Sequence, residues 1–149
     1  MKITFGVIDL PYSHSDDLGK SKSGKSRVST TGDVAEILEE KYGVMEYFWD
    51  RHQKEIVAAL EDGIEGTLNN LLNGAPPNAS AFIAGEAEIE ELFQKFLDAK
   101  EMDYKVDGVP TGASLKGVSH RFKRKRGPVR PSFIDTGLYE SSFVCKVVE

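Results

Sequence analysis

The sequence predicts an α+β fold in which two to three helices pack on a small antiparallel sheet and extended, flexible arms leave this body. Three observations predict it. Apolar residues alternate near the N-terminus, recur at three- and four-residue steps through the middle of the chain, and alternate again near the C-terminus. The chain has 149 residues, of which 40% are hydrophobic and 29% are charged. This length and composition suit one domain over residues 1–149.

The N-terminal part predicts a strand followed by an arm. Residues 1–10 read MKITFGVIDL, and Ile3, Phe5 and Val7 alternate with small or polar residues. Residues 13–32 are rich in Ser, Gly and Lys, a composition typical of a flexible arm.

The arm contains the stretch GKSKSGKS at residues 19–26, which matches the phosphate-binding pattern G-x-x-x-x-G-K-[ST]. A phosphate loop requires a strand that leads directly into the glycines and a helix that starts at the Lys-Ser pair. The strand ends near Leu10, and the RVSTTG that comes after Ser26 is a poor helix start. We therefore interpret the match as a product of composition, and we predict no cofactor and no enzymatic activity.

Residues 33–103 predict a helical body of three helices. The first begins near Asp33, where Thr30 and Thr31 offer N-cap hydroxyls, and ends or kinks at Tyr42-Gly43.

The second helix of this body runs from about Met45 to Leu72, and within it Gly63 and Gly66 mark a bend or a close helix contact. The third spans about Phe82 to Lys100.

Residues 104–149 predict a basic loop and a C-terminal strand region. Turns are expected at Asp107-Gly108, at Gly112 and at Gly127-Pro128. The segment ESSFVCKVV, residues 140–148, alternates moderately and predicts a strand.

The histidine, cysteine and glutamate residues that could carry chemistry are better interpreted as packing or surface residues. His52 is expected to be a satisfied, half-buried residue of the second helix, and Cys145 a packed strand residue. The acidic groups on the helices are expected to form solvated faces; they are Glu39, Glu40, Glu88, Glu90 and Glu91. No metal motif is present among the three histidines, and no apolar run is long enough to span a membrane.

Charge is unevenly placed along the chain, whose net charge is −5. Residues 33–103 contain 17 acidic and 5 basic residues, whereas residues 116–130 contain seven basic residues and no acidic one. The seven are Lys116, Arg121, Lys123, Arg124, Lys125, Arg126 and Arg130. Two partners fit this basic stretch: DNA phosphates, or the acidic body of a neighbouring subunit in a head-to-tail contact.

Residues 130–143 read RPSFIDTGLYESSF, and this segment resembles the C-terminal signature of tailed-bacteriophage virion morphogenesis proteins of the neck and tail-completion group. The residues that carry the resemblance are Pro131, Phe133, Asp135, Thr136, Gly137, Leu138 and Phe143. Those proteins usually carry an Arg-Pro-aromatic element and an Asp-Thr-Gly-Leu element separately and in the other order, whereas here the two are fused. The stretches MKITFGVIDLPY, TTGDVAEILEEKYGVMEYF and GVPTGASLKGVSHR also resemble virion proteins of contractile-tailed phages.

The motif itself predicts a structural device. Asp135-Thr136-Gly137 is expected to form a turn, and Leu138 and Phe143 are expected to anchor the C-terminal segment to the core.

The resemblance implies a structural subunit of the virion, assembled in the host cytoplasm. It implies a homo-oligomeric ring of six or twelve copies that acts as a head-tail connector, tail-completion or tail-terminator component around the DNA path. Neighbouring portal, neck or tail proteins would be its partners. The alternative that the residues leave open is a DNA-binding accessory protein that uses the basic loop at 116–130.

Overall fold

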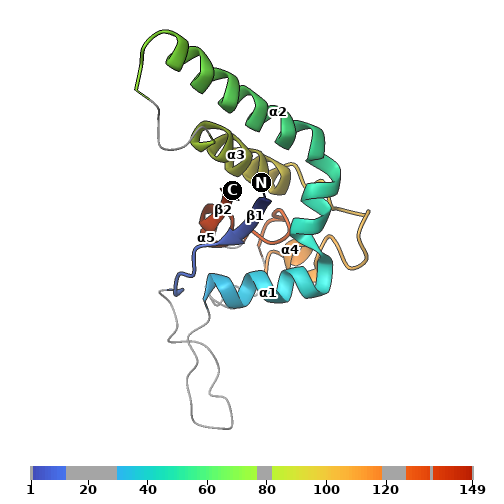
Figure 1. Cartoon of the computed structure of the whole chain (residues 1–149). Coiled ribbons are helices and arrows are strands. Elements are labelled where there is room, and N and C mark those ends of the chain that lie inside the picture. The colour runs from blue at the N-terminus through green and yellow to red at the C-terminus, as the bar shows by residue number, and fades with distance from the viewer. Residues whose placement is uncertain (1, 13–29, 77–81, 119–126, 135, 149) are drawn as a thin grey trace.

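A computed structural model describes residues 2–12, 30–76, 82–118, 127–134 and 136–148 (Figure 1). In these ranges the chain forms five helices and one two-stranded antiparallel sheet, which confirms the predicted α+β class. Three of the helices are long and account for the predicted helical body, and two have only five residues each.

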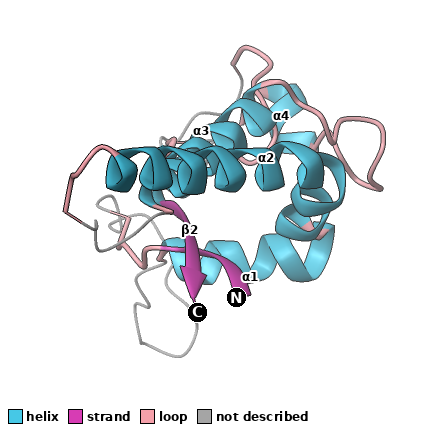
Figure 2. Ribbon diagram, turned by 45° about the horizontal axis from the view of Figure 1, so that its top comes forward, coloured by secondary structure: helices cyan, strands magenta, loops and turns pink. Residues whose placement is uncertain are grey.

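The sheet joins the two ends of the described chain. Strand β1 (Lys2–Val7) pairs with strand β2 (Phe143–Val148), with Phe5 opposite Cys145. The two termini therefore lie side by side (Figure 2). The predicted first strand is too long, because β1 ends at Val7 and residues 8–12 run along the start of the first helix instead.

Helix α1 (Thr31–Tyr42) begins where its capping residues predict. Thr30 is the N-cap, and its hydroxyl accepts from the backbone N–H of Asp33 (3.2 Å) while the Asp33 carboxylate accepts from Thr30 N. Gly43 ends the helix in the left-handed conformation, with φ 59°.

The predicted arm at 13–32 is too long at its C-terminal end, because Thr31 and Gly32 belong to α1. The buried Thr31 hydroxyl accepts from Leu10 N (2.8 Å) and donates to Ile8 O (2.6 Å). Residues 13–29, and with them the stretch at 19–26, lie outside the described residues.

Helix α2 (Val44–Leu72) confirms the predicted long helix, but its bend lies elsewhere. The non-helical residue is His52, with φ −113° and ψ 16°. The His52 ring packs against Phe48 and Phe96, and its Nε2 lies 3.1 Å from Glu101 Oε2. The bend thus coincides with contacts between segments far apart in sequence, which a local glycine pattern does not reveal.

Helix α3 (Ile83–Asp98) supplies the close helix contact. A Cβ atom on Gly85 would lie 2.6 Å from Ala59 O, so the backbones of α3 and α2 touch there. A Cβ atom added to Gly66 would lie within 4 Å of no atom beyond the adjacent backbone of α2, so the predicted close helix contact is wrong for that glycine.

The core lies between α2, α3 and one face of the sheet, and it is mainly aromatic. Phe93 stacks on Phe143 with ring centroids 3.9 Å apart, and Phe48 meets Phe93 edge to face at 5.1 Å. Phe5 of β1 extends this cluster towards Trp49. Cys145 is fully buried here, as predicted, and burial raises the pKa of its thiol to about 12.

Two short helices replace predicted turn and strand residues. Helix α4 (Gly112–Lys116) forms where a turn is predicted, with Thr111 as its N-cap. Helix α5 (Leu138–Ser142) takes the first residues of the predicted C-terminal strand, which therefore starts only at Phe143. Helices of five residues are too short to leave a periodic signal in a sequence.

Candidate functional site: the stem of the basic stretch

The basic stretch, residues 116–130, begins and ends at one place in the fold. Its first cation, Lys116, is the last residue of α4 and its side chain is exposed. Gly127 N donates to Lys116 O (3.1 Å), so the described residues on either side of 119–126 lie close together. The predicted contact residues within 119–126 lie outside the described residues; they are Arg121, Lys123, Arg124, Lys125 and Arg126.

We call the two segments on either side of 119–126, residues 112–118 and 127–132, the stem, and they come into close contact at Gly117. A Cβ atom there would lie 2.4 Å from Gly127 C and 2.5 Å from Pro128 O, and the backbone has φ 59°. Only glycine meets both requirements without displacing the backbone. This close contact therefore fixes the relative position of the residues just before and just after 119–126.

Arg130, the last predicted contact residue, is turned towards the fold. Its guanidinium donates to Ile134 O and, at 3.0 Å, to Val118 O, and the residue is half-buried. Its backbone N donates to Ser114 O (3.2 Å). Arg130 thus ties the two segments of the stem together, and the prediction that it also contacts a partner stays a prediction.

A buried pair of hydroxyls completes the stem. Ser114 Oγ and Ser132 Oγ lie 3.2 Å apart, and Ser114 Oγ donates to Thr111 O (2.9 Å). Thr111 N in turn donates to Ser132 Oγ (3.2 Å). These partners satisfy polar groups that burial would otherwise leave unpaired, and the sequence offers no local signal for a pairing across 18 residues.

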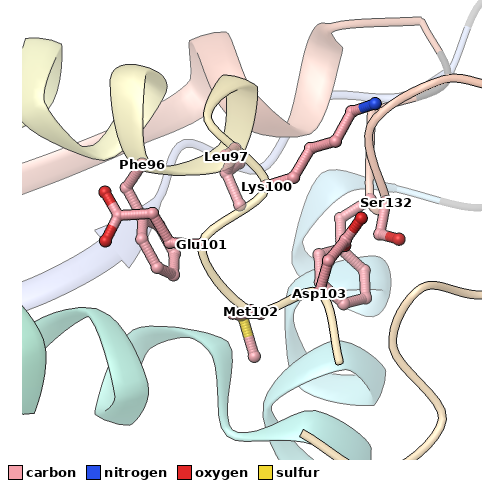
Figure 3. Close-up of a pocket in the computed structure, with 8 residues that line it drawn as sticks. Phe96, Leu97, Lys100, Glu101, Met102, Asp103 and Ser132 are labelled. Carbon is pink, nitrogen blue, oxygen red and sulfur yellow. The ribbon is translucent and has the colours of Figure 1, made fainter. Parts of the chain in front are cut away.

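Pro131 and Phe133 of the motif lead from the stem to the helical body. Phe133 has φ 70°, and its ring packs on Tyr42 of α1 with centroids 5.2 Å apart. Beside it a cavity of about 10 Å³ lies between the end of α3 and the 132–133 turn (Figure 3). That volume is about one water molecule, so the cavity does not hold a larger ligand.

The predicted turn of the motif is present in its described residues. Gly137 has φ 76°, and the Thr136 hydroxyl accepts from Leu138 N (3.2 Å); Asp135 lies outside the described part. Phe143 is buried as predicted, but Leu138 is only half-buried, and Tyr139 is the residue that enters the core beside Phe93. The one-residue difference arises because α5 comes directly after the turn and rotates its second residue inward.

Two glutamates of α3 seal the outer edge of β2. Glu86 Oε1 accepts from Val147 N (2.9 Å), and Glu90 Oε1 accepts from Cys145 N (3.2 Å). Glu86 Oε2 also binds Lys146 Nζ at 2.8 Å. Burial raises the pKa of Glu86, but its bonds to Lys146 and to the Val147 N–H outweigh that effect and hold the pKa below its ordinary value.

The prediction of a purely solvated acidic face is therefore wrong for Glu90. It is also wrong for Glu39, whose carboxylate accepts from Met45 N (2.7 Å) and Glu46 N (3.1 Å) at the start of α2. Glu91 fits the prediction, since it is exposed and pairs with Lys95 one turn away.

An open groove of about 630 Å³ lies beside the other strand, β1. Its apolar lining comes from Ile3, Phe5, Met45 and Trp49. Glu39 and Glu46 from the α1–α2 corner also line it.

Metal binding and membrane insertion would each require a particular arrangement of residues. Within the described ranges, no group of three His, Cys, Asp or Glu side chains is placed to hold a metal ion. Among the described helices, none is both long and apolar enough to cross a membrane.

Comparison of the chain with protein-family models, with curated proteins and with solved structures finds no match. The function is therefore argued from the residues and their geometry.

Proposed function

We propose that the chain is a structural subunit of a tailed-phage virion, which forms a homo-oligomeric ring in the neck or tail-completion region and joins head to tail around the DNA path. The observation that carries the proposal is the segment Arg130–Phe143, which resembles the C-terminal signature of such proteins. In the structure this segment links the stem of the basic stretch to α5 and β2.

The use of the motif residues supports a structural role. Arg130 bonds backbone carbonyls on both sides of the stem, Phe133 packs on Tyr42, and Phe143 stacks on Phe93. Each of these residues holds one part of the fold to another. A stem whose two segments are bonded to each other, with basic residues between them in the sequence, suits a subunit whose contacts form during assembly.

The experiment that tests this function removes the chain from a phage that encodes it. We expect filled heads and finished tails to accumulate separately in electron micrographs, and the chain supplied in trans to restore joined particles. In a reconstruction of the intact particle, the chain should occupy a ring between portal and tail. Normal particles formed without the chain, or a virion reconstruction that lacks it, would contradict the proposal.

A second function, that of a DNA-binding accessory protein, is favoured by one observation. Seven cations and no acidic residue lie within 116–130, and clustered cations of this kind bind phosphates by displacing counterions. This binding would not require a ring.

The test of the second function is a salt titration of DNA binding. Replacing Arg124, Lys125 and Arg126 with Ala should weaken binding. It should also make the negative slope of log K against log salt shallower, by about 0.9 for each lost phosphate contact. Lys54→Ala, an exposed cation on α2, is the control and should change little. Absence of salt-sensitive binding by the wild-type protein would exclude this function.

A further inference from the structure

The end of α2 carries an apolar surface that α3 does not cover. Gly85 lies against Ala59 and α3 begins at Ile83, so α2 continues past the start of α3 (Figure 1). The apolar stripe of α2 continues with it. We call this the distal surface, and its residues are Ile64, Leu68, Leu71, Leu72 and Ile83.

The exposure of the distal surface is unusual for residues of this kind. Leu72 is 84% exposed, Ile83 63% and Leu68 54%. Single exposed leucines are common on protein surfaces, but several on one helical stripe indicate a place where another chain packs.

The charge around the distal surface has one sign. Glu61, Asp62 and Glu65 accompany it on α2 and are acidic, and residues 55–94 contain no Lys, Arg or His. Two such surfaces would repel each other, which disfavours pairing of α2 with the α2 of another copy. The partner that this surface fits is therefore a segment with both cationic and apolar side chains.

The chain itself contains such a segment at another part of the molecule. The basic stretch combines its seven cations with Val118, Phe122 and Val129. Its stem starts at α4, which lies away from the end of α2 in both Figure 1 and Figure 2. The acidic end of α2 and the stem of the basic stretch thus lie at different places on the same chain.

We infer that the distal surface of one copy binds the basic stretch of a second copy. This inference deepens the proposed function, on which it rests, by naming the contact between neighbouring subunits. The contact is head-to-tail, so each copy uses two different surfaces, and repetition with a closing rotation produces a ring. Leucines of α2 would supply the apolar burial, and the carboxylates would select the cationic partner.

The first test measures the association of the purified full chain by sedimentation velocity over a range of protein and salt concentrations. We expect association that weakens as salt rises. Glu61→Lys with Glu65→Lys should abolish it. The matched control is Glu36→Lys with Glu40→Lys, two glutamates with the same spacing on α1, which should leave association unchanged.

A charge exchange distinguishes this contact from general electrostatic attraction. Lys125→Glu with Arg126→Glu should also give monomers, and a chain that carries both pairs of reversals should associate again. An equal mixture of the two single-surface variants should also associate, because the unchanged distal surface of one variant binds the unchanged basic stretch of the other and the two reversed surfaces complement each other.

A third variant tests the apolar side chains of the distal surface. Leu68→Ser with Leu72→Ser should weaken association at all salt concentrations without changing its salt dependence, while circular dichroism reports an intact fold. A wild-type chain that stays monomeric at every concentration overturns the inference, and so does equal damage from the α1 control. Neither result depends on phage particles, so the proposed function is judged separately by the particle experiment.

Discussion

The two halves of α2 share one apolar stripe, but the stripe is buried in the first half and largely exposed in the second. In residues 44–60 the stripe is buried against α3 and the sheet, and Val44, Phe48 and Ile56 are inaccessible to solvent. In residues 61–72 it is half-buried at best, and Leu68 and Leu72 are exposed. The difference teaches that helical periodicity predicts which face of a helix is apolar, but only the length and position of the neighbouring helix decide how much of that face is buried.

The largest expected change in stability comes from a substitution in the buried half of α2. Phe48→Ala should lower the free energy of unfolding by about 3–5 kcal/mol, because it removes the ring that contacts Phe5, Phe93, Phe96 and Phe143 and leaves a cavity. Urea denaturation of the purified chain measures it. A loss below that of an exposed residue would mean that the aromatic cluster is not the core.

Replacing two glycines by alanine should change the stability of the fold in opposite directions. Gly85→Ala should destabilise by about 1–3 kcal/mol, because its Cβ would lie 2.6 Å from Ala59 O and push α3 from the first half of α2. Gly66→Ala, in the second half, has open space around it and should stabilise by up to about 1 kcal/mol. Thermal unfolding of both variants provides the measurement, and equal signs would contradict the arrangement of the two helices.

The Glu86–Lys146 pair should make stability depend on pH. The pKa of Glu86 is lowered in the folded state, so its stabilisation is present above the ordinary value of 4.5 and is lost as pH falls through the lower, folded pKa. The pKa of Lys146 is raised by its bond to Glu86, so its contribution is present below 10.5 and is lost as pH rises through the higher, folded pKa.

The variant that checks this pH dependence is Glu86→Gln, which should cost about 1–2 kcal/mol at neutral pH and reduce the loss of stability at acid pH. Glu61→Gln, on the exposed half of α2, is the matched control and should leave both properties unchanged. Denaturation curves collected between acid and neutral pH measure the effect, and identical acid sensitivity of Glu86→Gln and wild type would contradict it.

The smallest effect on folding is expected at the distal surface. Leu72→Ala removes a side chain that is 84% exposed, so the free energy of unfolding of the monomer should change by less than about 0.5 kcal/mol. The same denaturation assay, at a protein concentration where the chain is monomeric, provides the measurement. A loss comparable to that of Phe48→Ala would show that the end of α2 packs within its own chain.

The sequence by itself determined the elements whose signals are local. The N-cap at Thr30, the helix end at Gly43 and the apolar periodicity of α2 and α3 all depend on residues a few positions apart, and the structure confirms them. The turn at Gly137 and the burial of Cys145 result from the same short-range patterns.

Only the tertiary structure decided the features that join distant residues. The bend at His52 lies beside Glu101, the edge of β2 is sealed by carboxylates more than fifty residues away, and the stem of the basic stretch depends on Gly117 meeting Gly127. The same holds for the choice of Tyr139 rather than Leu138 as the core anchor and for the exposed end of α2. Each depends on where a second segment lies in space, and a pattern confined to one segment carries no information about that position.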